Sequence, residues 1–198
     1  MQVDLSRYDN SCYTPGRSPW IQALWFFVGL PVLRASWIPF SGLRVWLLRL
    51  FGARVGKGAV IKPGVRVKYP WRLEIGNHCW IGEDSWIDNL AAVAIGSNVC
   101  ISQGAYLCTG NHDWTDSGFA LITRPIFIQD GAWVGAKALI CPGTSIGAGA
   151  VASAGCVASG RLEPYTIYSG NPATPIKHRI IRESEEMVPA AYGTPAKL

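Results

Sequence analysis

The chain has 198 residues, of which 49% are hydrophobic and 16% are charged, and its formal net charge is +5. This length corresponds to one domain with appendages, and the charge suits anionic partners such as a membrane face or a phosphorylated cofactor. No nucleic-acid-binding motif is present, which argues against nucleic acid as a partner. Six cysteines without a CxxC pair, and the lack of a signal-peptide pattern, predict a reduced, cytoplasmic protein without a disulfide framework.

The first 54 residues are expected to form an N-terminal segment that is irregular at first and helical afterwards. Residues 1–19 are polar and broken by prolines, whereas the stretch from Trp20 to Phe51 is apolar and rich in tryptophan. Its first apolar run is too short to span a bilayer, which takes about 20 apolar residues. Two interpretations stay open. The stretch forms two helices, the second at Leu43–Phe51, that cap the fold that follows, or Trp20–Phe40 is an interfacial membrane segment.

A six-residue period dominates the chain from residue 55 to residue 173. Aliphatic residues recur at every sixth position, with a small residue five places into each step, and the run is clearest at Ile128, Val134, Ile140, Ile146, Ala152 and Ala158. The period matches neither a helix nor a long strand, but it suits a chain that turns a corner every six residues. It predicts an all-β solenoid, a parallel β-helix of about five coils that stack on one another.

The period has one long interruption, between Leu107 and Ile128. A functional site is expected there, because the regular coils offer no loop on which to build one. His112 lies in this interruption, and a neutral imidazole is the usual general base. Either Asp113 or a backbone carbonyl is expected to hold its other ring nitrogen. Cys108 is a rival nucleophile that would form an acyl-enzyme. A metal site is not predicted at His112, Asp113 and Asp116, because no second histidine lies nearby to complete the ligands.

The period ends after Arg161, and residues 174–198 are expected to form a C-terminal tail. A Gly-Asn-Pro-Ala turn at residues 170–173 leads into a basic stretch at residues 175–179. The tail is expected to be a short helix, to which Glu183, Glu185 and Glu186 give an acidic, solvated face.

The repeat, the segment Thr109–Asp113 and the turn at residues 170–173 resemble the left-handed β-helix, or hexapeptide-repeat, acyltransferases. The amino-acid sequence of residues 47–53, 69–73, 100–110 and 111–114 is similar to that of the colanic acid biosynthesis acetyltransferases of bacterial exopolysaccharide clusters. The period itself does not reveal the hand of the coil, so the left hand is implied by the resemblance alone.

The resemblance implies a homotrimer with sites between subunits, in which His112 deprotonates a sugar hydroxyl that attacks acetyl-CoA directly, without a metal. Asn89, Asp113 and Trp114 would contact the acceptor, although Asn89 also fits a structural corner position. The residues implied for the cofactor are Gly135, Ala136, Ala154, Ser159, Gly160, Lys177 and Arg179. The glycines and alanines among them are also what a tight corner needs, so the two basic residues carry the independent chemical argument.

Several functions stay open at this point. The favoured one is an O-acetyltransferase that acts on a sugar or exopolysaccharide precursor, working in the cytoplasm or at the inner face of the cytoplasmic membrane on a lipid-linked glycan. A small non-sugar hydroxyl or amine is an alternative acceptor. A non-catalytic β-helix scaffold is an alternative of another class, in which His112 would have no task. A metal-dependent hydratase on this fold would need three histidines at each site.

Overall fold

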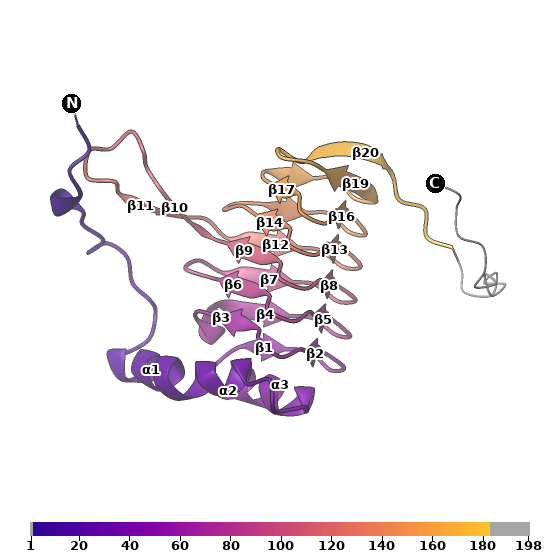
Figure 1. The fold of residues 1–198 in the computed structure, drawn as a ribbon, viewed down its shortest axis with the longest axis horizontal. Coiled ribbons are helices and arrows are strands. Elements are labelled where there is room, and N and C mark those ends of the chain that lie inside the picture. The colour runs from indigo at the N-terminus through magenta and orange to yellow at the C-terminus, as the bar shows by residue number, and fades with distance from the viewer. Residues whose placement is uncertain (1, 183–198) are drawn as a thin grey trace, which may run out of the picture.

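The computed structural model describes residues 2–182, which form a three-sided β-solenoid with helices at its base and a long hairpin on one side (Figure 1). Three parallel sheets make the sides of the prism. Sheet A holds β1 (Arg54–Val55), β4 (Leu73–Ile75), β7 (Val93–Ile95), β12 (Ile126–Ile128), β15 (Ser145–Ile146) and β18 (Arg161–Leu162). Sheet B holds β2 (Val60–Ile61), β5 (Trp80–Ile81), β8 (Cys100–Ile101), β13 (Trp133–Val134), β16 (Val151–Ala152) and β19 (Thr166–Ser169). Sheet C holds β3 (Arg66–Val67), β6 (Trp86–Asp88), β9 (Tyr106–Cys108), β14 (Leu139–Ile140) and β17 (Val157–Ala158).

The six-residue period explains this architecture, because its aliphatic position is the inward residue of each short strand. In sheet B the inward side chains stack in register from coil to coil as Ile61, Ile81, Ile101, Val134, Ala152 and Tyr168. All of them are buried. At the corners small residues are required by the neighbouring coil: a Cβ on Gly76 would lie 2.6 Å from the backbone of Gly96. The predicted parallel solenoid is therefore confirmed.

The solenoid has about six turns, one more than the period predicts. The step from Ala158 to Leu162 spans four residues instead of six, which ends the period in the sequence. The ladder nevertheless continues, because Leu162 pairs with Ile146 and Tyr168 with Ala152, both as buried inward residues. A shortened step therefore shortens a corner without stopping the coil.

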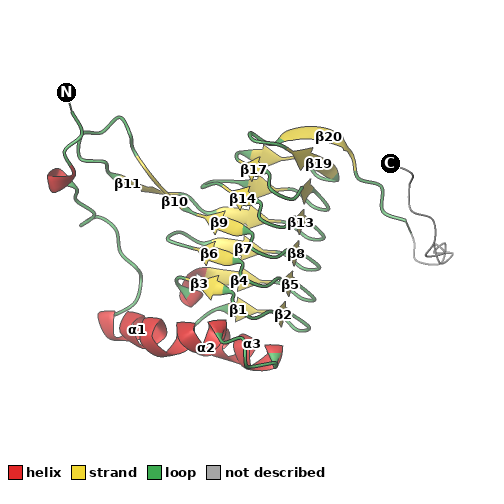
Figure 2. Cartoon of the chain, viewed as in Figure 1, coloured by secondary structure: helices red, strands yellow, loops and turns green. Residues whose placement is uncertain are grey.

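Two antiparallel helical rods close the base of the solenoid (Figure 2). The first consists of α1 (Pro19–Leu24), a π-helical turn (Trp25–Gly29) and α2 (Leu30–Arg34), and the second is α3 (Ser41–Leu50). Trp25 is buried, and its indole Nε1 donates to the carbonyl of Val67 in the first coil at 3.0 Å. Leu33, Leu47 and Leu48 join the same core cluster. These helices cap the open end of the solenoid, which confirms the capping interpretation.

Arg44 joins the two rods from inside. Its side chain is 1% exposed, and its guanidinium donates to the carbonyls of Leu33, Ala35, Ile38 and Phe40. These four carbonyls belong to the end of α2 and the turn that follows, so one cation satisfies the acceptors that the helix end leaves open. Burial lowers the pKa of Arg44. A guanidinium nevertheless stays charged in a protein, so the contact is charge-assisted.

Residues 2–18 run up the outside of the prism from the base to the hairpin (Figure 1); we call them the strap. The strap is tied at both ends and in the middle. The amide of Asp4 donates to the carbonyl of Ser117 at 2.9 Å, the hydroxyl of Tyr13 donates to the carbonyl of Leu90 at 3.0 Å, and the indole of Trp71 donates to the carbonyl of Pro15 at 2.7 Å.

The described start of the C-terminal tail is a strand, so the prediction of a short helix beginning at residue 175 is wrong. β20 (Thr174–His178) turns back and pairs antiparallel with β19. The last coil leaves the backbone groups of β19 without a next coil to pair with, and an antiparallel strand satisfies them. The predicted acidic face at Glu183, Glu185 and Glu186 lies outside the described residues. Within residues 2–182, every helix is too short or too polar to cross a bilayer.

Candidate functional site

The interruption of the repeat folds into a two-stranded hairpin that leaves the prism directly after β9. β10 (Gly110–His112) pairs antiparallel with β11 (Leu121–Thr123), and His112 lies opposite Leu121. The Nδ1 atom of His112 is 2.9 Å from the carbonyl oxygen of Phe119, and the two rings stack with centroids 4.4 Å apart. A carbonyl only accepts, so Nδ1 carries the proton, and in the neutral imidazole Nε2 has the lone pair. The imidazole is thus fixed in orientation and in the tautomer that a general base needs.

A cavity of about 400 Å³ opens beside this ring. Its lining comes from the hairpin and from two successive coils at the corner between sheets C and A: Asn111, His112, Asp113, Trp114, Thr115, Ile122, Arg124, Cys141, Pro142 and Ser159. Four of the sequence-predicted site residues meet here, namely His112, Asp113, Trp114 and Ser159. Trp114 is 75% exposed, so its ring is available to a ligand or to a neighbouring molecule.

A second cavity, of about 480 Å³, lies at the corner between sheets B and C. Its lining includes four of the residues predicted for the cofactor, Gly135, Ala136, Ala154 and Arg179. Gly160 and Lys177 line neither cavity, and Ser159 belongs to the first one. The predicted cofactor set is therefore divided between two corners of a single prism.

The comparisons with known proteins agree with this geometry. The family model described as "Hexapeptide repeat of succinyl-transferase" matches residues 72–108 and 125–158. The chain is 37% identical to the "Putative colanic acid biosynthesis acetyltransferase WcaF" of Escherichia coli, over 81% of this chain and 88% of that protein. The chain belongs to the hexapeptide-repeat acetyltransferases. It is also 30% identical to the galactoside O-acetyltransferase of Escherichia coli, over 69% of this chain and 66% of that protein.

Solved structures of this fold support the assignment. A hexapeptide-repeat acetyltransferase from Vibrio cholerae aligns with a TM-score of 0.72 and 26% identity, over 81% of this chain and 93% of that one. The structure of that protein complexed with acetyl coenzyme A aligns with a TM-score of 0.74 and 22% identity, over 82% and 88% of the two chains.

Asp113 does not orient the histidine of this acetyltransferase, because its carboxylate is engaged elsewhere. Its Oδ1 accepts from the amide of Thr115 at 2.9 Å and from the hydroxyl of Thr115 at 2.6 Å. These bonds hold the pKa of Asp113 below its usual value. Of the two orienting groups that the sequence left open, the backbone carbonyl is the one observed, and Asp113 shapes the tip of the hairpin.

Asn89 occupies a buried corner position and lines neither cavity, so its contact with the acceptor stays a prediction. It is wholly buried, its Oδ1 accepts from the amide of Tyr69 at 2.9 Å, and its Nδ2 donates to the carbonyl of Tyr69 at 2.7 Å. The preceding Asp88 is instead linked to the outward side chains of sheet C. Its Oδ2 accepts from the hydroxyl of Tyr106 at 3.1 Å, and its Oδ1 lies 3.3 Å from Nζ of Lys68.

Several residues of the site were not predicted from the sequence. Arg124 supplies a cation to the first cavity, and Tyr8 of the strap brings its ring to 5.8 Å from that of His112. Phe119, which orients His112, has a positive φ of 57° in a turn. These contacts join segments distant in sequence or depend on a turn conformation. The one available signal was that Arg124 closes the interruption of the repeat.

Two cysteines are near enough to the site to test covalent catalysis. Cys141 lines the cavity with His112, and burial raises the pKa of its thiol, so it is protonated at neutral pH and weakly nucleophilic. The thiol of Cys108 donates to the carbonyl of Gly110 at 3.2 Å. We expect Cys108→Ser and Cys141→Ser each to keep the wild-type rate within about three-fold. Loss of the rate in either variant, or an acetylated cysteine in a mass spectrum of the enzyme quenched during turnover, would contradict direct transfer.

Among residues 2–182 no group of three or more histidine, cysteine, aspartate and glutamate side chains is placed to hold a metal ion.

Proposed function

We propose that this chain transfers the acetyl group of acetyl-CoA to a hydroxyl of a sugar or exopolysaccharide precursor, with His112 as the general base. The observation that carries the proposal is the bond between Nδ1 of His112 and the carbonyl of Phe119, which in the neutral imidazole assigns the lone pair to Nε2, on a residue that lines a cavity. The relatives support the substrate class, because one is named for colanic acid biosynthesis and another for galactoside acetylation. The Vibrio cholerae structure with acetyl coenzyme A supports the donor.

In this mechanism Nε2 of His112 takes the proton of the acceptor hydroxyl as the oxygen attacks the thioester carbonyl. The carbonyl oxygen becomes an oxyanion, which backbone N–H groups along the groove would stabilise as the charge develops. The carbon–sulfur bond then breaks, the ester forms, and the thiolate of CoA receives the proton from the imidazolium. No residue is acylated, which agrees with the protonated state of Cys141.

The distribution of the site residues supports a homotrimer. In one prism the cavity of His112 and the groove of Gly135, Ala136 and Ala154 lie at different corners. In an assembly of parallel prisms the hairpin of one subunit can reach the groove of its neighbour, which would bring the base and the donor together. A site shared in this way exists only in the oligomer.

The groove at the corner between sheets B and C would hold the pantetheine arm. Gly135 is fixed by packing alone, since a Cβ there would lie 2.4 Å from the amide nitrogen of Ala154. Ala154 is exposed and therefore available to a ligand. Arg179 lines the groove and donates through Nη1 to the carbonyls of Gly131 and Gly149, which leaves its other N–H groups for a phosphate. Lys177 is exposed on β20 nearby, and Ser159 and Gly160 would contact the donor only from another subunit.

The test is thiol release from acetyl-CoA with a panel of sugars, nucleotide sugars and non-sugar alcohols and amines. We expect a sugar-dependent rate, and we expect Ala154→Trp to bind acetyl-CoA at least about ten-fold more weakly because the indole fills the groove. Ala92→Trp is the matched control, since Ala92 is exposed and lines neither cavity. A rate that requires an amine or a non-sugar alcohol would assign the alternative acceptor class. Failure of the wild type to bind acetyl-CoA would favour a scaffold.

A further inference from the structure

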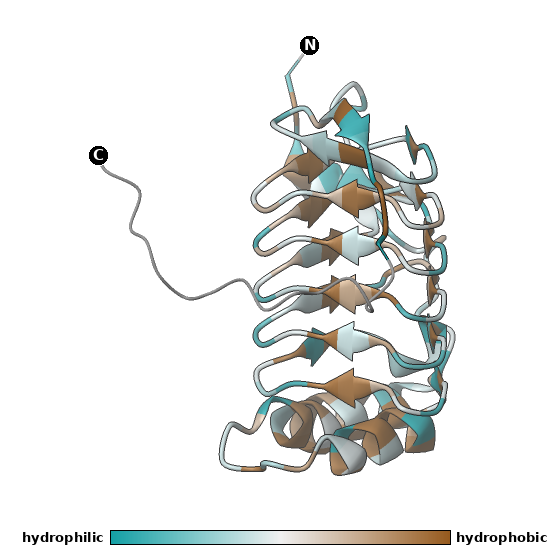
Figure 3. Cartoon of the chain, turned by 90° about the vertical axis from the view of Figure 1, so that its right-hand side faces the viewer, coloured by the Kyte–Doolittle hydropathy of each residue, from teal (hydrophilic) through white to brown (hydrophobic). Residues whose placement is uncertain are grey.

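The outer face of the helical cap is apolar, although its inner face already completes the core. The two rows of exposed apolar side chains are Trp20, Leu24, Phe27, Val28 and Pro31 on the first rod and Leu43, Trp46 and Leu50 on α3. Phe27 and Pro31 lie at the flank, where they line cavities against the lower coils. Both rows follow the helical spacing of three to four residues. Trp20 is 85% exposed and Trp37, in the turn between the rods, is 82% exposed. In Figure 3 much of the helices at the base has the brown colour of hydrophobic residues, as the strands of the prism also do.

A capping role alone does not explain this face. A terminal cap of a solenoid needs an apolar inner face and a polar outer face, because the outer face meets water. Here the inner face is satisfied by Trp25, Leu33 and Leu48, and the four bonds of Arg44 fix the turn between the rods. The exposed rows are therefore not needed for the packing of the core. Exposed apolar surface of this extent is typical of an interaction site.

The charge around the cap identifies the partner. Between Asp9 and Glu74 the sequence contains no acidic residue but ten of its 18 lysines and arginines. Arg54, Lys62 and Lys68 form ion pairs with residues of the next coil. Arg17 and Arg34 are exposed and form no ion pair within residues 2–182. Arg34 and the exposed Trp37 line one cavity, which Glu83 and Asp84 also line. Exposed tryptophans together with unpaired cations are typical of segments that lie in the headgroup region of anionic bilayers.

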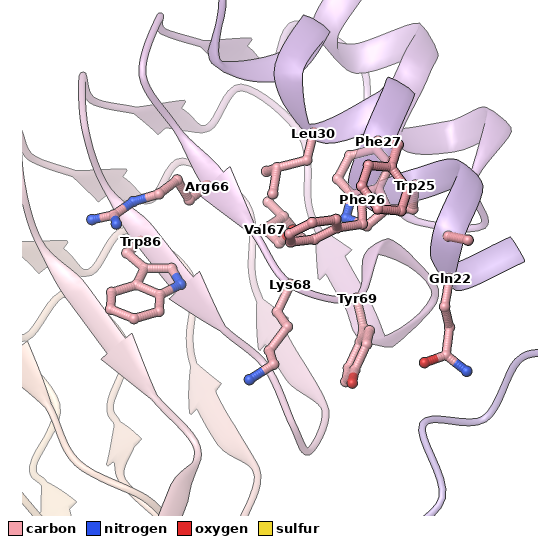
Figure 4. Close-up of a pocket in the computed structure, with 11 residues that line it drawn as sticks. Gln22, Trp25, Phe26, Phe27, Leu30, Arg66, Val67, Lys68, Tyr69 and Trp86 are labelled. Carbon is pink, nitrogen blue, oxygen red and sulfur yellow. The ribbon is translucent and has the colours of Figure 1, made fainter. Parts of the chain in front are cut away.

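A cavity at the flank of the cap extends the same surface. It measures about 470 Å³ and lies between the first rod and sheet C (Figure 4). Phe26, Phe27 and Leu30 line it from the cap, and Arg66 and Lys68 line it from β3 and the residue that follows. Lys68 is paired with Asp88, whereas Arg66 forms no ion pair within the described residues. An apolar cavity with a free guanidinium in its lining is suited to a hydrocarbon chain that ends in a phosphate.

We propose that the cap is a membrane-binding end, which lies with its exposed rows in the headgroup region of an anionic phospholipid bilayer. The helices would lie in the plane of the membrane, because α2 and α3 carry arginine and no helix of the cap is long enough to cross it. This inference goes beyond the proposed function and does not depend on it, because it uses no residue of the acetyl-transfer site.

The experiment is co-sedimentation of the full chain with vesicles of phosphatidylcholine, with or without 30% phosphatidylglycerol (about one lipid in three, a typical anionic fraction). We expect binding to the anionic vesicles that weakens at high salt. The double variant Trp20→Gln and Trp37→Gln is expected to lower the partition coefficient about ten-fold or more. The matched control, Trp80→Gln with Phe127→Gln, removes two aromatic side chains of 46% and 49% exposure from the prism and should bind like the wild type.

Two further measurements keep the outcomes separate. An unchanged melting temperature and an unchanged acetyl-CoA-binding affinity in Trp20→Gln with Trp37→Gln show that a loss of vesicle binding is not a loss of folding. Sedimentation velocity tests the competing occupant, a second copy of the cap. A doubling of mass that this variant abolishes, with no wild-type binding to either vesicle, would overturn the membrane proposal. Equal vesicle binding by the wild type and the variant would also overturn it.

Discussion

His112→Ala is expected to lower kcat about 10²–10⁴-fold, the contribution of a single positioned general base. The fold should be unchanged, because the ring lies on a hairpin outside the solenoid and makes one hydrogen bond, to the carbonyl of Phe119. KM for acetyl-CoA should change little, because the predicted donor groove is formed by other residues. Steady-state thiol release with the acceptor found in the panel measures both constants.

Two variants control this experiment. His112→Asn keeps a donor towards Phe119 but has no basic nitrogen, so it should be as inactive as His112→Ala. His78→Asn removes another histidine at an exposed corner with a φ of 55°, a conformation that asparagine tolerates, and should keep the wild-type rate. A His112→Ala enzyme with more than a tenth of the wild-type kcat would place the base elsewhere.

Arg44→Ala is expected to lower the free energy of unfolding of the cap by about 3 kcal/mol or more. Four carbonyls would lose their donor, and leaving one buried acceptor unsatisfied costs about 1–3 kcal/mol. Arg44→Lys should recover part of the loss, because an ammonium keeps the charge but cannot span the same acceptors. Arg34→Ala, at an exposed position of α2, should change the stability by no more than about 0.5 kcal/mol.

Urea unfolding followed by tryptophan fluorescence measures the Arg44 effect, because Trp25 lies buried against the first coil. Neighbouring repeats contribute separately to the stability of a solenoid, so the cap should unfold before the upper coils, and limited proteolysis should first cut near residues 35–40. Coincident unfolding of cap and solenoid, with no shift in the midpoint, would contradict this role for Arg44.

The solenoid was predictable because its information is local and repeated. Each inward residue, such as Ile81 or Ile140, reports its own position by a fixed spacing, and the coil pairs with the next through the same spacing. The tail was predicted wrongly because its structure depends on the open edge of β19, which is a property of the completed stack. The four-residue step to Leu162 ended the period for a related reason, since pairing tolerates a shorter corner.

The site was predictable where chemistry marks it and not where three-dimensional contacts do. His112 is a titratable residue at the main interruption of a regular repeat. The carbonyl of Phe119, the ring of Tyr8 and the cation of Arg124 reach it through a turn, the strap and the far end of the hairpin. Asn89 and Asp88 are adjacent in the sequence, and only the coil geometry shows that the amide is committed to Tyr69.

The stacking of the coils also sets a height. The hairpin leaves sheet C at β9, two strands above β3, and the first coil rests on helices. With a strand spacing of about 4.8 Å and a helix about 10 Å thick, β9 lies about 20 Å above the outer face of the cap. If the prism stands on a bilayer, the hairpin that carries the proposed general base, His112, would leave the prism at that distance from the membrane surface. The enzyme would then select hydroxyls on glycans that project well clear of the lipid. The number of coils below the hairpin would set the distance between the membrane and the acceptor hydroxyl.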